Sequence, residues 1–111
     1  MQTNDLFLDN YLTTIKDDYK NFVTRAGILD TSGQIDRIKD FSDNLTFKFG
    51  SKYIKVMNKG SVHSFIVNTD KDIKFKEGDI LMAASWKAPA RNFARGNVFA
   101  PDTIKARWMG V

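Results

Sequence analysis

Apolar side chains recur every three or four residues through the first part of the chain. The stripe consists of Leu8, Tyr11, Leu12, Ile15, Tyr19, Phe22 and Val23. This spacing places them on one face of an α-helix, and mostly polar residues occupy the other face. We therefore predict a helix over about residues 4–25, which Thr3 or Asn4 would cap at its start and Gly27 would end.

The stretch that follows, residues 28–43, permits two structures. Ile35, Ile38 and Phe41 have helical spacing, but Asp and Ser are frequent between them. A short strand over residues 35–41 fits the pattern equally well. The sequence makes no choice between the helix and the strand.

From residue 44 the period switches to two, because Leu45, Phe47 and Phe49 alternate with Thr46 and Lys48, which is typical of a strand buried on one face. The predicted strands cover residues 45–49, 53–57, 62–67, 80–86 and 103–109. A helix followed by five short antiparallel strands with tight turns predicts a small, strongly bent barrel. We expect a mainly β protein with an N-terminal helix, in which a five-stranded antiparallel barrel occupies about residues 44–110 of a single domain.

The composition narrows the class of protein. A chain of 111 residues forms one domain, and 42% hydrophobic with 27% charged residues is ordinary for a soluble protein. The sequence contains no cysteine, which excludes disulfides and thiolate metal sites and fits a reducing compartment. No apolar run approaches the length of a membrane span, and the N-terminus lacks a signal pattern. We expect a cytoplasmic protein, or one made in the cytosol of a host.

The positive charge is concentrated near the C-terminus. Residues 1–86 hold 12 Lys and Arg against 12 Asp and Glu, whereas residues 87–111 hold 5 against Asp102 alone, which accounts for the net charge of +4. In the same region the basic residues alternate with Trp86 and Phe93. Cations meet phosphates and aromatic rings stack on bases, so this pattern favours single-stranded nucleic acid as a partner.

Residues that carry catalytic chemistry are scarce. His63 is the only histidine, and strand alternation puts Ser64 on the opposite face from it. The acidic residues at positions 70, 72, 77 and 79 match no calcium loop and alternate with lysines. The sequence also lacks a phosphate-binding glycine loop and a dinucleotide fingerprint. We predict neither an enzyme nor a cofactor or metal site.

Two short motifs resemble those of a known family. Arg95-Gly96-Asn97, followed by Val98, is similar to the second signature of Sm-like proteins (the Sm, LSm and Hfq superfamily), and Met57-Asn58 is similar to the end of the first. With the predicted helix and barrel, the whole chain resembles the uncharacterised Sm-like proteins of marine phage. The resemblance implies a homo-oligomeric ring, closed by pairing the fourth and fifth strands of neighbouring subunits, that binds single-stranded nucleic acid.

This resemblance gives the candidate residues their roles. We expect RNA as the ligand and a chaperone or regulator as the function. Carboxamides would bind base edges, Arg95 would stack on a base or hold a phosphate, and other cations would extend the basic track. The predicted nucleic-acid-binding residues are Asn58, Lys59, Lys87, Arg91, Arg95 and Asn97, and Gly96 would shape their loop.

A second hypothesis assigns the same residues structural roles. Asn58 would then be a turn residue, Gly96 a glycine with positive φ, and Arg95 a brace on Asp102. Small barrels host many functions, so the alternative to nucleic-acid binding is that the barrel is a protein-docking module. Under this alternative the chain is a phage structural or assembly protein that does not bind RNA.

Overall fold

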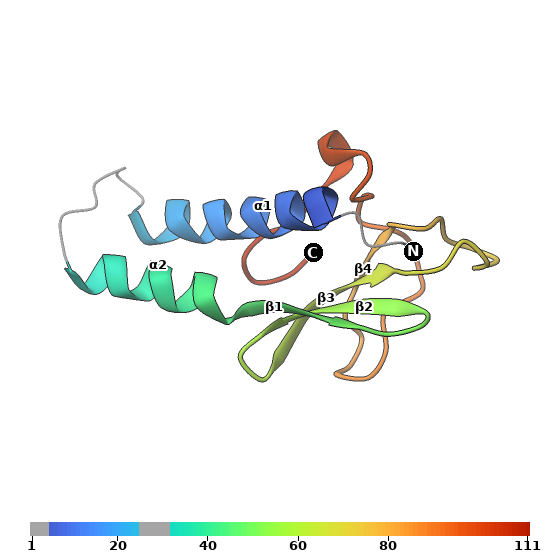
Figure 1. Ribbon diagram of the computed structural model, residues 1–111, viewed down its shortest axis with the longest axis horizontal. Coiled ribbons are helices and arrows are strands. Elements are labelled where there is room, and N and C mark those ends of the chain that lie inside the picture. Colours follow the sequence, from blue (N-terminus) through green and yellow to red (C-terminus); the bar gives the residue numbers. More distant parts are fainter. Residues whose placement is uncertain (1–4, 25–31) are drawn as a thin grey trace.

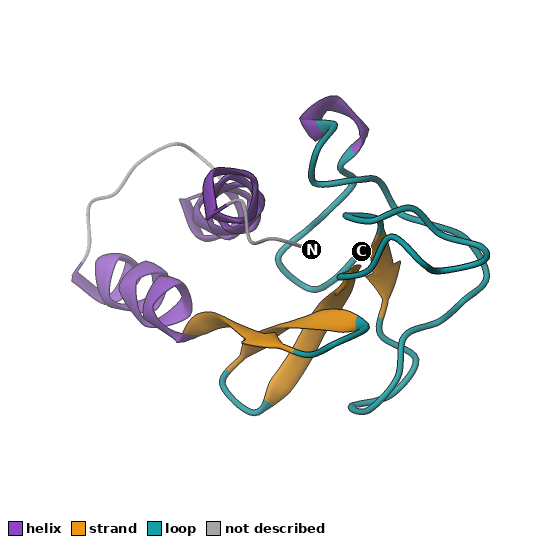
Figure 2. Cartoon of the chain, turned by 45° about the vertical axis from the view of Figure 1, so that its right-hand side comes forward, coloured by secondary structure: helices purple, strands orange, loops and turns teal. Residues whose placement is uncertain are grey.

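A computed structural model describes residues 5–24 and 32–111 of the chain. The elements follow in the order α1 (Asp5–Thr24), α2 (Ser32–Asn44), β1 (Leu45–Phe49), β2 (Tyr53–Asn58), β3 (Ser61–Val67), β4 (Ile80–Met82) and the short 3-10 helix η1 (Pro101–Thr103). Figure 1 shows α1 lying along one side of the strands, and in Figure 2 the chain after β4 is almost entirely loop and turn.

Helix α1 is the predicted N-terminal helix, and its apolar stripe makes the main core contact. Leu8, Tyr11 and Ile15 are at most 1% exposed and pack against one face of the sheet. The caps expected at Thr3, Asn4 and Gly27 lie outside the described residues. The stripe thus predicts both the helix and the face that it buries.

Residues 32–44 form the second helix, so the helical spacing of this stretch prevails over the alternative strand. Phe41 stacks on Tyr19 of α1 with ring centroids 4.2 Å apart and an interplanar angle of 11°. An exposed ion pair between Lys39 and Asp43, at helical i,i+4 spacing, stabilises α2 slightly. Packing of Phe41 against a ring of α1 is what favours the helix over the strand.

The strands form one antiparallel sheet in the order β1-β2-β3-β4. The β1–β2 hairpin pairs Lys48 with Lys55 and Phe47 with Val56. Between β2 and β3 the register shifts at Val56 and Met57, which makes a bulge in the hairpin. The first three strands lie where the sequence predicts them, whereas β4 ends at Met82 instead of continuing to residue 86.

The predicted closed five-stranded barrel is wrong, because the sheet is open and has four strands. Residues 103–109, the expected fifth strand, contain no strand. Pro101 begins a 3-10 turn, and Arg107 and Gly110 bond to each other across a second turn. The backbone N–H of Trp108 instead donates to the carboxylate of Asp18 on α1 at 2.9 Å. The segment therefore folds back on the helix rather than pairing with β1.

The open sheet carries a different apolar cluster on each face. The face toward α1 holds the larger core, which includes Ile54, Val56 and Ile66. The opposite face has a smaller cluster built from Phe65, Val67, Phe75 and Leu81. These four residues are at most 6% exposed, so the polar side chains of that face lie beside a covered cluster.

Candidate nucleic-acid interface

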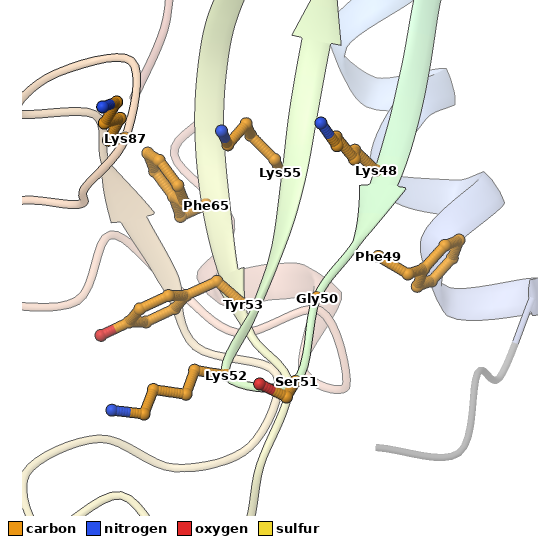
Figure 3. Close-up of a pocket in the computed structure, with 9 residues that line it drawn as sticks. All are labelled: Lys48, Phe49, Gly50, Ser51, Lys52, Tyr53, Lys55, Phe65 and Lys87. Carbon is orange, nitrogen blue, oxygen red and sulfur yellow. The ribbon is translucent and has the colours of Figure 1, made fainter.

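Lysines and aromatic rings gather on the face of the sheet that is turned away from α1. In Figure 3 the side chains of Lys48, Lys55 and Phe65 project to the same side of the strands, and Phe49 projects to the other. They belong to a shallow pocket of about 310 Å³. It is lined by Lys48, Phe49, Gly50, Ser51, Lys52, Tyr53, Lys55, Phe65 and Lys87. None of these described lining residues is acidic. We call this surface the lysine face.

Strand register creates the lysine face. Lys48 and Lys55 are directly paired across β1 and β2, and Phe65 pairs with Lys55 from β3. Like charges directly opposite each other destabilise a strand pair. A nearby aromatic ring offsets that repulsion, since the Lys55 Nζ atom lies 5.8 Å from the ring centroid of Phe65.

Trp86 reaches this face from the loop that follows β4. Its ring centroid is 3.7 Å from Lys55 Nζ and 5.6 Å from Lys48 Nζ, and the side chain remains 48% exposed. The loop is closed by backbone bonds from residues 84 and 85 to the carbonyl of Ala88, at 3.1 and 3.0 Å. A half-exposed indole therefore lies among ammonium groups, where it can also accept a stacked ring.

Arg91 lies beside this face, but its guanidinium is already paired with other side chains of the protein. Its guanidinium forms two bonds to the Asp72 carboxylate, both 2.9 Å, and donates to the Tyr53 hydroxyl at 2.6 Å. The Asp72 carboxylate also accepts the backbone N–H groups of Lys74 and Phe75. These interactions, led by the Arg91 bond, hold the pKa of Asp72 well below its usual range. Arg91 thus fixes Tyr53 and a neighbouring loop.

Two residues of the Arg95-Gly96-Asn97 motif are held by neighbouring parts of the chain. The Asn97 carboxamide donates to the Glu77 carbonyl at 3.0 Å and the Asp79 carboxylate at 2.9 Å, and it accepts the Phe99 N–H at 2.8 Å. Gly96 has φ of 123°, and a Cβ there would lie 2.5 Å from the Thr103 carbonyl oxygen. Both residues are therefore bound into the loop that joins β4 to the C-terminal segment.

Arg95 projects from the same motif into a separate pocket. Its guanidinium lies 4.0 Å from the ring centroid of Phe93, with Lys105 also on the pocket wall. A second contact reaches the Met82 sulfur at 3.8 Å, and the buried Nε atom has no hydrogen-bond partner in the described structure. Asp102, the brace expected under the structural hypothesis, is not among the contacts found for Arg95.

Asn58 and Lys59 lie at the far end of the β2–β3 hairpin. Lys59 takes the positive φ of the turn, 56°, and its ammonium pairs with Asp40 of α2 at 2.7 Å. This pairing raises the pKa of Lys59. Asn58 lines a pocket of about 550 Å³ beside Tyr19 and Trp108. The predicted site residues therefore fall in separate places, and Lys87 is the one that lines the lysine face.

His63 is buried in a polar network rather than a reactive site. Its Nε2 atom lies 2.6 Å from the Arg107 carbonyl oxygen, and its Nδ1 atom lies 2.8 Å from the Ser64 hydroxyl. Ser64 also bonds to the Tyr11 hydroxyl at 2.7 Å, despite the opposite faces expected for Ser64 and His63. The bulge in β3 brings the two side chains together. No cluster of three metal-ligating side chains occurs within residues 5–24 and 32–111.

Sequence reasoning missed the residues that make up most of the lysine face. Lys48, Lys52, Lys55 and Tyr53 belong to the electrically neutral first 86 residues, where no local excess of charge marks them. The feature of the sequence that could have identified them is the predicted hairpin of residues 45–49 and 53–57. A short turn between residues 49 and 53 brings Lys48 opposite Lys55, an unfavourable pairing that a purely structural hairpin has reason to avoid.

In the described residues, the fold and this face define a small protein in which α1 and α2 accompany an open antiparallel sheet with a basic, aromatic surface. The chain belongs to the DUF7717 family, a family of unknown function whose model matches residues 3–109. No curated protein and no solved structure matches it. The likeness to Sm-like proteins therefore rests on the short motifs alone. None of the described helices is both long and apolar enough to cross a membrane.

Proposed function

We propose that this protein binds single-stranded nucleic acid on the lysine face. The observation that carries the proposal is the convergence of Lys48, Lys52, Lys55 and Lys87 on one pocket whose described lining contains no carboxylate. Lysine is a compact point charge that suits phosphate oxygens, and several lysines in a row follow a phosphate backbone. The proposal keeps the ligand class that the sequence favours and moves the site away from the Arg95 loop.

The aromatic groups favour single strands over duplexes. Phe65 is 1% exposed and packs edge to face against Tyr53, with centroids 5.8 Å apart, whereas Trp86, at the edge of the lysine face, is 48% exposed. Stacking on such a ring requires an unpaired base, and it is tolerant of sequence because every base has a π-face. Phosphates would bind the lysines while one base stacks on Trp86.

The tryptophan also supplies a direct signal of binding. Lys55 and Lys48 hold their ammonium groups over the indole, and a phosphate that drew them away would change the surroundings of the ring. We therefore expect oligonucleotides to change the fluorescence of Trp86. This change on binding should be absent from the variant Trp86→Phe. The fluorescence of Trp108, which lies on the α1 side of the sheet, should change little when an oligonucleotide binds.

The test measures binding of labelled oligo-U, oligo-A and oligo-dT by fluorescence anisotropy at several salt concentrations. In the double variant Lys48→Gln, Lys55→Gln the log–log salt slope should become shallower by about 0.7 for each phosphate that the protein no longer neutralises. Trp86→Ala should weaken binding by about 1–3 kcal/mol. Lys20→Gln is the matched control, since Lys20 is an exposed lysine on α1.

Equal binding by the wild type and the double variant at every salt concentration would rule out the lysine face. If none of the three oligonucleotides binds at low salt, the protein-docking alternative becomes the better explanation. Comparison of oligo-U with oligo-dT tests the expected preference for RNA. The roles of chaperone or regulator, and the ring, remain predictions, and the strand expected to close that ring is absent from residues 103–109.

A further inference from the structure

The two edges of the sheet differ in how their backbone groups are used. At the β4 edge, Ile80 N–H donates to the Gly96 carbonyl at 2.8 Å, and Arg95 N–H donates to the Ile80 carbonyl at 2.7 Å. Ala90 N–H donates to the Met82 carbonyl at 2.7 Å. The chain after β4 therefore covers this edge and prevents it from pairing with another strand.

The β1 edge has no such cover among the described residues. Gly50 N–H bonds to the Tyr53 carbonyl, which places the backbone groups of residues 46 and 48 toward β2. Those of Phe47 and Phe49 consequently point outward, and no backbone partner is found for them in the described structure, whereas Leu45 is only 4% exposed. The edge also lacks proline and a bulge, two common devices that block strand addition.

We propose that a second copy of this chain occupies this edge, with β1 pairing antiparallel to β1 about a two-fold axis at Phe47. This inference does not depend on nucleic-acid binding. Phe47 would face Phe47 of the other copy, and Leu45 would face Phe49. Phe49, which is 52% exposed in the single chain, would then gain an apolar neighbour. The ring of Phe47, 5.9 Å from that of Phe49, lies on the same side of the strand.

The charges on the strand are compatible with this register. Centring on Phe47 puts Lys48 opposite Thr46 of the other copy, so that no like charges are directly paired across the new contact. Antiparallel partners share a face, which places both copies of Lys48 on the same side of the joined sheet. The two lysine faces would then form one continuous surface, with both α1 helices on the other side.

Thr46 provides a charge test with a matched control. Its side chain is exposed, so substitutions there should leave the fold of one chain intact. Thr46→Lys would place a lysine opposite Lys48 of the other copy at two symmetric positions, and we expect dimerisation to weaken about tenfold. Thr46→Glu would create two opposite-charge pairs, and dimerisation should strengthen. Sedimentation velocity over a range of concentrations measures both effects.

A second variant tests the backbone groups themselves. Phe49→Pro removes an N–H that has no partner within the described chain, so far-UV circular dichroism should be unchanged while the dimer is lost. Phe49→Ala keeps the N–H and should retain a weakened dimer. A mass of one chain, 12.7 kDa, at millimolar concentration would overturn the proposal. A dimer that ignores the charge at position 46, or an assembly larger than a dimer, would overturn it equally.

Discussion

At the scale of single residues, the carboxamide of Asn97 bonds the loop after β4 to residues that precede that strand. It contacts the Glu77 carbonyl, the Asp79 carboxylate and the Phe99 N–H. Asn97→Ala would leave these groups without their partner, and we expect it to lower the free energy of unfolding by about 1–3 kcal/mol. Urea unfolding measures the loss, and a stability equal to that of the wild type would contradict the assigned role.

Asn92 offers a matched control for this substitution. Its side chain is exposed and, within the described residues, accepts the N–H of the next residue, Phe93, at 2.9 Å. Asn92→Ala should therefore change the free energy of unfolding by no more than about 0.5 kcal/mol. Asn97→Asp should destabilise as well, because it replaces a donor with a carboxylate beside Asp79.

The buried network around His63 predicts how stability depends on pH. A carbonyl can only accept, so the His63 Nε2 atom donates to Arg107 and Nδ1 accepts from Ser64, which accepts from Tyr11. Burial raises the pKa of Tyr11, which keeps this hydroxyl protonated. Burial also lowers the pKa of His63 from its ordinary 6.5, against a smaller opposing effect of the Arg107 bond.

The unfolded chain therefore takes up a proton on His63 near pH 6.5, and the folded chain does so only at lower pH. Stability from this group is complete above the unfolded pKa and is lost as the pH falls through the folded pKa. Urea midpoints measured from pH 8 to pH 5 should fall below about pH 6.5. In His63→Gln, which cannot titrate, that decline should disappear, and a flat wild-type profile would contradict the prediction.

At the scale of elements, Arg91 joins two loops to strand β2. It binds Asp72 with two bonds and Tyr53 with one, while Lys74 Nζ donates to the Arg91 carbonyl at 2.6 Å. Arg91→Lys keeps the charge but loses the planar, two-bond geometry. We expect faster hydrogen exchange at the amides of residues 72–76 while β1 and β2 stay protected.

Arg37→Lys is the control, since Arg37 is an exposed arginine on α2. It should leave exchange in residues 72–76 unchanged. If Arg91→Lys also leaves them unchanged, the Asp72 turn holds this loop without the guanidinium. Because Tyr53 belongs to the lysine face, the same variant shows whether a free tyrosine alters oligonucleotide binding.

At the scale of the whole molecule, the chain's two tryptophans have separate roles. Trp108 packs against Tyr19 and Phe22 of α1, at 5.2 and 4.9 Å between ring centroids, and against Phe41 of α2 at 6.3 Å. Trp86, in contrast, is half exposed on the lysine face. Trp108→Ala should reduce the free energy of unfolding by about 2–4 kcal/mol, since it truncates a large side chain of the core. Trp86→Ala should change it little while weakening binding, and similar unfolding curves for the two variants would contradict this division.

Local patterns explain why much of the chain was predictable. The helical stripe of α1 and the alternation of β1 each depend on neighbours in the sequence. The structure confirms the helix and the first three strands, although a bulge in β3 breaks the alternation there. For the segment of residues 103–109, the alternation correctly places Ile104, Ala106 and Trp108 against the core, yet no strand forms. Alternation predicts which side chains are buried, but it does not predict whether the backbone forms hydrogen bonds with another strand.

The sequence by itself therefore determined a long N-terminal helix, two hairpin-linked strand pairs and an excess of positive charge. Tertiary structure alone decided that residues 32–44 are helical, since that depends on Phe41 meeting Tyr19. It also decided that the sheet stays open, because the last segment bonds to Asp18 and His63 instead of a strand. The lysine face arose the same way: strand register brings Lys48 to Lys55, and a distant loop brings Trp86 to both.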